Sequence, residues 1–253
     1  MLKKRLIPKL LLKDGRNVKG IQFENLRDVG HPVTNARIYD AQGADELIFL
    51  DITASAEERS ILYDIIARTA EEIFMPFCVG GGIRSVADIR GLLQAGADKV
   101  SVNTAAVENP RVIEEGATLF GAQCIVASID FRRHRRRCRV YTHGGAVAAG
   151  LDVLDHARRL VDLGAGEILL TSIDRDGTMQ GYDLEITRAV ADAVPVPVIA
   201  AGGPGTLQHL VDAIQEGHAS AVAVGSLFHF TDQSPIKARA FMRVAGVDVR
   251  SDK

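Results

Sequence analysis

MPFCVGGGIRSVADIRGLLQAGADKVSVNTAA (residues 75–106) and VPVIAAGGPGTLQHLVDAIQEGHASAVAVGSL (residues 196–227) decide the fold, because each segment can be laid over the other. Each has an apolar run, a glycine turn, an amphipathic stretch and a second apolar run, which is typical of a strand–helix–strand unit. Glycines and prolines that agree at one spacing favour an internal duplication over chance likeness. Three pairs share an offset of 121 residues (203 − 82), namely Pro76 with Pro197, Gly82 with Gly203 and Gly96 with Gly217.

The rest of the chain continues this alternation. Near-continuous apolar runs are expected to be strands of a parallel sheet buried on both faces, at residues 5–12, 46–52, 77–81, 99–103, 124–130, 167–173, 198–202 and 221–225. Amphipathic stretches between them are expected to be helices, at residues 33–42, 57–73, 85–95, 109–119, 152–163, 184–193, 206–216 and 234–245. A strand followed by a helix, eight times over, predicts an α/β fold, the (β/α)8 TIM barrel. An open doubly wound sheet is disfavoured, because the sequence has no dinucleotide-binding fingerprint after its first strand.

A chain of 253 residues has the right size for a single barrel domain. The duplication divides this domain into two (β/α)4 halves, at approximately residues 1–122 and 123–253. Carried back to the first strand, the alignment places Leu11 on Asp130. One half therefore has a carboxylate where the other has an aliphatic side chain.

The composition argues against several classes of partner. A formal net charge of −2 with 25% charged residues gives no reason to expect a nucleic acid or a membrane. No apolar run approaches the roughly 20 residues that cross a bilayer, and the basic start lacks the small-residue cleavage site of a signal peptide. Three cysteines and the histidines have no metal-ligand spacing, so neither a metal site nor a disulfide framework is expected. We expect a cytoplasmic protein without a cofactor.

Glycine-rich or small-residue turns follow two strands in each half of the predicted barrel. They are VGGG (79–82) and VNTAA (102–106) in the first half, and AAGG (200–203) and VGSLF (224–228) in the second. Glycines let backbone N–H groups approach an anion closely, and the start of a helix favours negative charge. Since the loops after the strands form the active face of this fold, we predict two phosphate sites on opposite sides of the mouth. Either site alone would be equally compatible with plain tight turns.

With these turns included, the chain resembles the cyclase subunit of imidazole glycerol phosphate synthase over essentially its whole length. The resemblance is carried by KDGRNVKGIQFENLRDVG (13–30), GADELIFLDITAS (43–55), VGGGIRS (79–85), GADKVSVNTAAVENP (96–110), GAGEILLTSIDRDGT (164–178) and SLFHF (226–230). The related histidine-pathway isomerase shares the doubled barrel but lacks the FENLRD and ITAS signatures in this form.

The resemblance implies a lyase of histidine biosynthesis that forms a heterodimer with a glutaminase subunit at the barrel floor. Ammonia from the glutaminase would enter through the floor and travel along the barrel axis. The cyclase would use it to convert phosphoribulosyl-formimino-aminoimidazole-carboxamide ribonucleotide to imidazole glycerol phosphate and aminoimidazole carboxamide ribotide. This substrate carries a phosphate at each end, in agreement with two phosphate sites.

The resemblance also implies roles for individual residues. Asp130 matches one of two carboxylates that act as general acid and base, Lys19 matches a residue that closes over the substrate, and Asp98 matches a contact with the glutaminase. The residues expected to bind the substrate or its phosphates are Lys19, Asp51, Gly81, Gly82, Asn103, Thr104, Thr171, Asp176, Gly177, Gly202, Gly203, Gly225 and Ser226.

Four charged residues at the starts of strands match a gate for ammonia in the barrel floor. They are Arg5, Glu46, Lys99 and Glu167, of which the two glutamates are aligned by the duplication. Opposite charges in a ring satisfy one another when they are partly buried. On physical grounds alone the ring is a salt-bridge plug that stabilises the floor, whereas the resemblance favours a gate.

The chain departs from this family at the second carboxylate, whose position is occupied by Leu11. A leucine transfers no protons, so cyclisation is expected to lose about 10²–10⁴ in rate unless another group, such as Asp51, takes over. Lys9 lies two residues earlier and, by strand alternation, on the same interior face. We expect its ammonium group to reach Asp51 or Asp130 and to keep that carboxylate ionised. The alternative is a shifted first strand from which Lys9 extends outward.

Two other functions stay open. A paralogue of the cyclase would serve as the ammonia-channelling partner of a glutaminase and another amidotransferase, as in bacterial surface-sugar amidination. Leu11 and Lys9 favour this function, whereas the retained substrate residues favour the cyclase, which is the leading prediction. A non-catalytic sugar-phosphate-binding barrel is the third possibility.

Two charged segments are also expected near the mouth of the barrel. The loop that contains FENLRD (23–28) is expected to be a mobile lid. The segment RRHRRRCR (132–139) is expected to form an exposed hairpin after the fifth strand, and most of its charge is interpreted as solvated surface.

Overall fold

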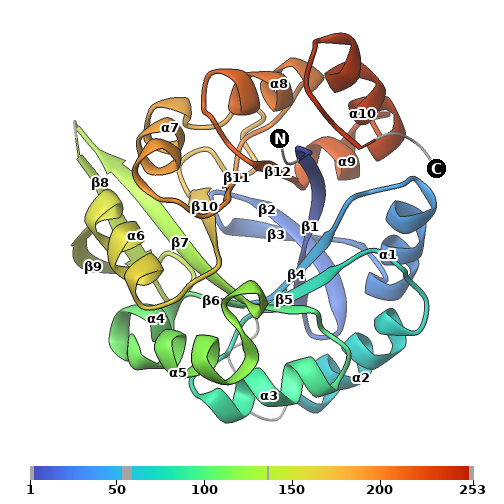
Figure 1. The fold of residues 1–253 in the computed structure, drawn as a ribbon. Coiled ribbons are helices and arrows are strands. Elements are labelled where there is room, and N and C mark those ends of the chain that lie inside the picture. The colour runs from blue at the N-terminus through green and yellow to red at the C-terminus, as the bar shows by residue number, and fades with distance from the viewer. Residues whose placement is uncertain (1–2, 53–58, 136, 251–253) are drawn as a thin grey trace.

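Eight strands run parallel around a closed barrel (Figure 1) in the computed structural model, which describes residues 3–52, 59–135 and 137–250. They are β1 (Arg5–Lys13), β4 (Leu47–Asp51), β5 (Phe77–Gly80), β6 (Lys99–Val102), β7 (Ile125–His134), β10 (Glu167–Ser172), β11 (Val198–Ala201) and β12 (Ala221–Val224). Each strand pairs with the next in this order, and β12 pairs with β1, which closes the barrel. The predicted strands and the predicted (β/α)8 TIM barrel are confirmed.

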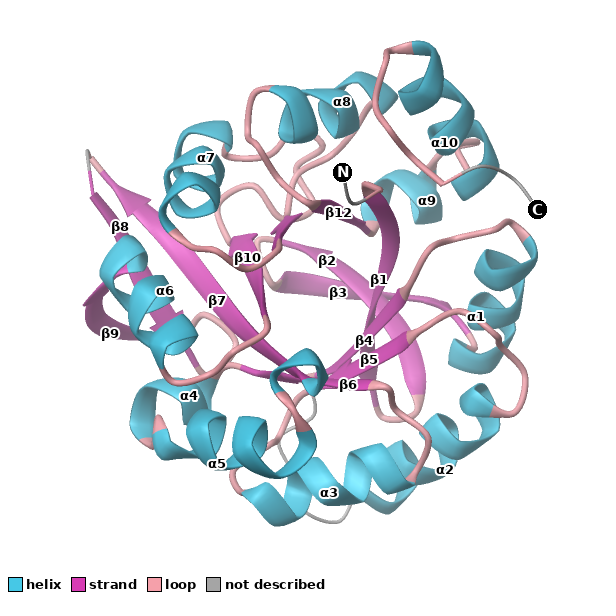
Figure 2. Ribbon diagram, viewed as in Figure 1, coloured by secondary structure: helices cyan, strands magenta, loops and turns pink. Residues whose placement is uncertain are grey.

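Helices surround this barrel (Figure 2). The longer ones are α1 (Pro32–Ala41), α2 (Arg59–Ala70), α3 (Val86–Gln94), α5 (Arg111–Phe120), α6 (Val153–Asp162), α7 (Leu184–Ala193), α8 (Leu207–Gln215) and α10 (Pro235–Val244). They confirm the predicted helices, although residues 57–58 of the second one lie outside the described residues. Three short helices go beyond the prediction, namely α4 (Thr104–Glu108), η1 (Ala122–Cys124) and α9 (Ser226–Phe230). Within the described parts of the chain, no helix is long and apolar enough to cross a membrane.

Strand side chains alternate between the barrel interior and the surrounding helices. Leu6 and Leu10 of β1 belong to the outer core, in which Phe49 meets Phe77 edge to face with ring centroids 4.9 Å apart. The intervening residues of the strands form a second, inner apolar layer, which consists of Ile7, Ile48, Cys78, Val126, Leu169, Ile199, Ala201, Ala221 and Ala223. Burial on both faces explains why the strand sequences are almost continuously apolar.

An antiparallel ribbon takes the place of the lid loop expected between β1 and α1. Its strands are β2 (Arg16–Ile21), which pairs with β1, and β3 (Glu24–Gly30), which pairs with β2. The turn between β1 and β2 is Asp14-Gly15, with φ angles of +50° and +74°, and this dipeptide favours a two-residue hairpin. The segment expected to be a mobile lid is thus a regular hairpin, which the Asp14-Gly15 dipeptide signals, and its mobility stays a prediction.

β7 continues beyond the barrel and forms an antiparallel extension with β8 (Arg137–Thr142) and β9 (Val147–Asp152). The hairpin predicted from RRHRRRCR is confirmed, although Arg136 lies outside the described residues. The interpretation of this segment as solvated surface needs one correction. Arg133 donates hydrogen bonds of 3.0 and 2.8 Å to Asp183 and thereby ties the extension to the start of α7.

The turns before β6 and β12 differ by one residue between the two halves. Gly96 adopts a positive φ of +112° after α3, whereas after α8 the positive φ of +56° belongs to His218 and not to Gly217. β6 and β12 accordingly start 122 residues apart (221 − 99). The pairing of Gly96 with Gly217 is wrong by one position, because the second half has one more residue in this turn. The duplication itself stays a prediction.

His156 is a buried histidine on α6 whose side chain faces the core. It is 4% exposed, and neither ring nitrogen has a hydrogen-bond partner in the part of the chain that the structure describes. Burial, followed by the charge of Arg159, lowers the pKa of His156 to about 4. The neutral imidazole is therefore the form that the fold accepts.

We expect the stability of the protein to fall as the pH decreases from about 6.5 to about 4, because the unfolded chain binds a proton at His156 in this range and the folded chain does not. His156→Leu should reduce this slope. Urea unfolding at several pH values measures it, with His134→Gln on the exposed end of β7 as the control. An unchanged slope in His156→Leu would contradict the assignment.

Candidate functional site

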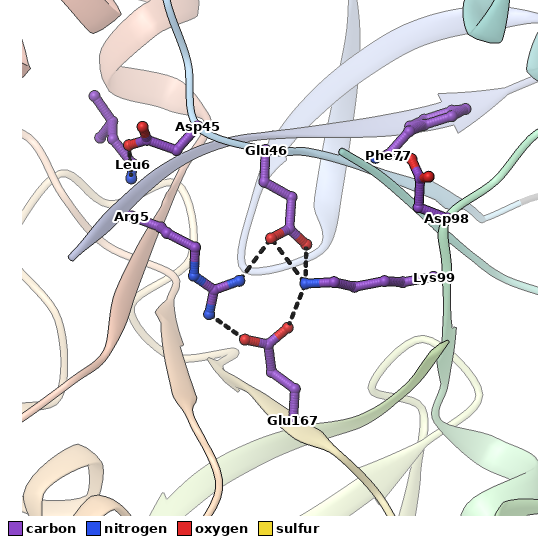
Figure 3. A network of polar contacts seen from close by, with 8 residues as sticks. All are labelled: Arg5, Leu6, Asp45, Glu46, Phe77, Asp98, Lys99 and Glu167. Carbon is purple, nitrogen blue, oxygen red and sulfur yellow. Dashed lines mark hydrogen bonds and ion pairs between the residues drawn. The ribbon is translucent and has the colours of Figure 1, made fainter. Parts of the chain in front are cut away.

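Four charged side chains meet at the floor of the barrel (Figure 3). Arg5, Lys99 and Glu167 begin β1, β6 and β10, and Glu46 immediately precedes β4. Arg5 donates to Glu46 at 2.6 Å and also pairs with Glu167. Lys99 completes the ring with distances of 2.9 Å to Glu46 and 3.0 Å to Glu167. The structure thus brings together the four residues of the predicted gate, with alternating charges.

The two glutamates of this ring are buried, while the two cations keep some contact with solvent. Burial raises the pKa of Glu46 by more than the neighbouring cations lower it. Burial also opposes the charge on Lys99, yet attraction by Glu167 and Glu46 raises the pKa of this ammonium group. The ring is therefore held together by mutual charge compensation, and separating any member leaves a buried charge without its partner.

Asp98, the predicted contact of a partner subunit, is exposed beside the ring and also has a structural role. Its carboxylate accepts a hydrogen bond of 2.8 Å from the backbone N–H of Phe77, and its own N–H donates to the Phe77 carbonyl at 2.8 Å. Asp45 makes the same pair of bonds with Leu6. Figure 3 shows both aspartates flanking the ring. They connect neighbouring strands where the barrel begins.

The two turns predicted to form a phosphate site in the first half, which we call the first-half cradle, lie where β5 and β6 end. Gly81 and Gly82 adopt positive φ angles of +104° and +64° after β5. A Cβ atom on Gly81 would collide with the carbonyl oxygen of Asp51, so this position requires glycine. Asn103 and Thr104 follow β6, and the Thr104 hydroxyl accepts a hydrogen bond of 3.1 Å from the backbone N–H of His143, which follows β8.

The corresponding turns of the second half, which we call the second-half cradle, lie where β11 and β12 end. Gly202 and Gly203 have φ angles of +85° and +116°. A Cβ atom on Gly202 would collide with the carbonyl oxygen of Ser172, the position 121 residues after Asp51. The two cradles therefore share the same close approach of backbone to backbone. A cavity of about 10 Å³ is lined by Lys9, Lys19, Asp176, Gly177, Gly202, Gly203, Pro204, Ala223, Gly225 and Ser226.

The ribbon covers this second cradle. The backbone N–H of Gln22 donates to the Asp176 carbonyl at 2.8 Å, and a Cβ atom on Gly177 would collide with the carbonyl of Gly20. Lys19, on β2, is thereby directed onto the Asp176 carboxylate, with both side chains 3% exposed. The structure thus joins Lys19, Asp176 and Gly177, three predicted binding residues that are far apart in the sequence.

Lys9 also contacts Asp176, with 3.5 Å between its Nζ and Oδ2 of the carboxylate. The side chain is buried inside the barrel, which excludes the alternative in which it extends outward. The prediction that Lys9 pairs with Asp51 or Asp130 is wrong about the partner, because the loop after β10 brings Asp176 over the end of β1. Burial opposes the ionised form of Asp176, but Lys9 and Lys19 together lower its pKa.

Asp130 occupies the interior face of β7 near the mouth, half-buried by surface area. Burial raises its pKa to about 6, Lys9 acts in the opposite direction, and Asp176 adds to the increase. The expectation that Lys9 keeps Asp130 fully ionised therefore needs correction, because burial outweighs the attraction. A carboxylate with such a pKa both accepts and releases protons near neutral pH.

Leu11 occupies the position in β1 that corresponds to Asp130 in β7. Leu11 pairs with Leu50, whereas Asp130 pairs with Thr171, and Thr171 follows Leu50 by 121 residues (171 − 50). The register thus agrees with the sequence alignment. Leu11 is 6% exposed, so the first half presents an apolar surface where the second half presents an acid.

Several contacts of the site could not be expected from sequence spacing. The pairing of Lys9 with Asp176 spans 167 residues, and the bond of 3.0 Å between Arg239 and Asp45 spans 194. No local pattern signals such contacts, whereas the Asp14-Gly15 turn was a usable signal for the ribbon. Among the described residues no group of three or more His, Cys, Asp or Glu side chains is arranged to hold a metal ion.

The closed parallel barrel, with an ionic floor, an apolar inner layer and glycine turns at the mouth, belongs to the (β/α)8 class, whose active sites lie at the ends of the strands. The family model described as "Histidine biosynthesis protein" matches residues 5–234. The chain belongs to this family, and it is a barrel enzyme of the histidine-biosynthesis type.

We expect Glu46→Gln to destabilise the fold by about 2–3 kcal/mol, because it leaves Arg5 and Lys99 to share one buried carboxylate. Urea unfolding at pH 7 measures the change. Glu72→Gln is the matched control, since it removes an exposed ion pair with Arg37 and should cost less than about 1 kcal/mol. Equal effects of the two variants would contradict the view of the ring as a cooperative unit.

As the pH rises from 4 to 8, we expect the unmodified protein to lose about 1–2 kcal/mol more of its free energy of unfolding than Asp130→Asn does. The folded pKa of about 6 lies above the unfolded value of 3.8, so the folded chain binds more protons in between and loses stability as the pH rises. Urea unfolding at both pH values tests this. Asp28→Asn should change in the opposite sense, because hydrogen bonds from Arg16 and Gly30 lower the pKa of Asp28.

Proposed function

We propose that the chain is a barrel of the cyclase branch, which binds a doubly phosphorylated substrate at its mouth and receives ammonia from a glutaminase subunit at its floor. The observation that carries this proposal is the closed ring of Arg5, Glu46, Lys99 and Glu167 across the barrel axis. A reaction confined to the mouth, such as an isomerisation, gives no reason for charged side chains in the floor. Buried charges are also a costly way to seal a barrel, which apolar side chains would fill more cheaply.

The inner apolar layer supports the same proposal. Ile7, Ile48 and Leu169 lie in the layer between the charged floor and the polar mouth. A neutral ammonia molecule crosses such a layer at far lower cost than an ammonium ion. The layer would therefore keep ammonia unprotonated on its way to the substrate, while the ring controls entry.

The arrangement of the mouth also favours a substrate with two terminal phosphates. Both cradles have two consecutive glycines of positive φ, and they follow strands on different sides of the barrel. Lys19 would close over the substrate from the ribbon, as the resemblance to the cyclase implies. Asp130 would carry protons during ring closure, for which its pKa of about 6 is well placed.

Ring closure would be slow in this chain, because proton transfer from the side of β1 has no carrier. Leu11 is buried beside Leu50 and offers no ionisable group. We infer that the barrel retains substrate and ammonia binding and turns over far below the rate that a pair of carboxylates would permit.

A second candidate function is favoured by Leu11 together with Lys9. An ammonia-channelling partner, which passes ammonia from a glutaminase to another amidotransferase, needs the floor and the axis but no second acid. The buried pair of Lys9 and Asp176 sits where substrate chemistry would occur and suits a barrel that no longer closes an imidazole ring.

Ammonia-dependent turnover of phosphoribulosyl-formimino-aminoimidazole-carboxamide ribonucleotide tests the proposal. Leu11→Asp should raise the rate by about 10²-fold or more, because it restores a proton carrier opposite Asp130. Leu11→Asn is the matched control, since it has the same size and polarity without an ionisable group, and should not raise the rate.

Equal and rapid turnover by the unmodified chain and by Leu11→Asp would contradict the inferred role of Leu11. Absence of turnover in Leu11→Asp, combined with ammonia transfer from a glutaminase to a second acceptor enzyme, would replace the cyclase by the second candidate. Binding of the substrate, measured by calorimetry in each variant, separates loss of chemistry from loss of affinity.

A further inference from the structure

Lys9 is an unusual residue to place inside a barrel. Its side chain is 4% exposed and lies on the interior face of β1, two residues beyond Ile7 of the inner apolar layer. Burying an ammonium group costs several kcal/mol unless good partners compensate it. Among the described residues its ion pair is the contact of 3.5 Å with Asp176, at the long end of the range for such a bond.

Asp176 divides its charge between two cations. Lys19 contacts one carboxylate oxygen and Lys9 the other. Each ammonium group has three N–H donors, and the repulsion between Lys9 and Lys19 contributes to the lowered pKa of Lys19, after burial as the main cause. One carboxylate therefore compensates two buried ammonium groups incompletely, and their donor capacity is not used up.

The same small cavity presents a further polar group that lacks a partner. The hydroxyl of Ser226 is buried, lines the cavity together with Lys9 and Lys19, and makes no hydrogen bond to any described residue. Buried hydroxyls are nearly always paired. A hydroxyl without a partner and two ammonium groups thus line one cavity from β1, β2 and α9, and this set of donors suits an anion with several oxygen atoms.

We propose that Lys9 is an additional anion-binding residue of the second-half cradle, where it and Lys19 clamp a phosphate dianion with the help of Ser226. Asp176 holds both ammonium groups in the ligand-free chain. This inference rests on the proposed function in so far as that function places a terminal phosphate in this cradle. It adds a cation from the barrel interior to a site otherwise built from the ribbon and from the segments that follow the strands.

Binding requires a rearrangement that the contacts make possible. The cavity of about 10 Å³ has room for about one water molecule, so a phosphate enters only when the lysine side chains or the ribbon give way. The longer contact between Lys9 and Asp176 is the weaker one and breaks first. Lys9 then turns from Asp176 to the phosphate. Lys19 either keeps its bond to Asp176 or also turns toward the phosphate.

Isothermal titration calorimetry with inorganic phosphate tests the clamp. Lys9→Met keeps the length of the side chain and removes its charge, and should weaken binding about tenfold or more. Lys13→Met is the matched control, because Lys13 is exposed at the end of the same strand and should leave the affinity unchanged. Lys19→Met should weaken binding at least as strongly as Lys9→Met.

Circular dichroism and the urea midpoint verify that each variant is folded. If Lys9→Met misfolds, Lys9→Gln provides the same comparison with a polar side chain. Phosphate affinity that is lost in Lys19→Met but unchanged in Lys9→Met would overturn the role of Lys9 and leave the cradle intact. Failure of the unmodified protein to bind phosphate would overturn both the clamp and the predicted cradle. Turnover is not part of the readout, so the clamp stands or falls independently of the cyclase chemistry.

Discussion

A charged side chain that a strand directs into a closed parallel barrel is costly to bury unless an opposite charge compensates it there. This constraint shapes both ends of the molecule. At the floor, two cations and two carboxylates form a complete ring. At the mouth, two ammonium groups share Asp176. The charges of the floor are thus compensated by residues at the starts of the strands. The charges of the mouth are compensated only because a loop and the ribbon close over it.

The two ends are therefore positioned by different parts of the chain. The members of the ring lie at the starts of strands or, for Glu46, one residue before a strand, so the barrel itself fixes their places. The mouth is assembled from β1, from the ribbon and from the loop after β10, so its contacts depend on segments outside the barrel strands. Asp130, whose pKa is about 6, and Leu11, which has no ionisable group, face this variable region from equivalent strand positions. Under the proposed function, this asymmetry leaves proton transfer at the mouth to the second half of the barrel.

The barrel and the position of Leu11 could be predicted from the sequence, because strand periodicity and the alignment of the two halves are local or repeated signals. The four residues of the floor were likewise predictable, since each marks the start of a strand. The partner of Lys9 was not, because Asp176 lies 167 residues away and reaches it only once the barrel is closed. The ribbon differs from these contacts, because its Asp14-Gly15 turn is a plain local hairpin signal, although the charged segment around it resembles a loop in composition. The one-residue difference at His218 lies in a turn, where a chain accepts an extra residue without disturbing the strands on either side.

β1 and the ribbon form one uninterrupted stretch of chain, from Arg5 at the floor, past Lys9 inside the barrel, to Lys19 above the mouth. The Asp14-Gly15 turn folds β2 back onto β1, so the strand that carries Arg5 and Lys9 is hydrogen-bonded to the strand that carries Lys19. Fifteen consecutive residues (5–19) thus supply charged groups to both ends of the barrel. A substitution in this one segment can therefore disturb the floor and the mouth together.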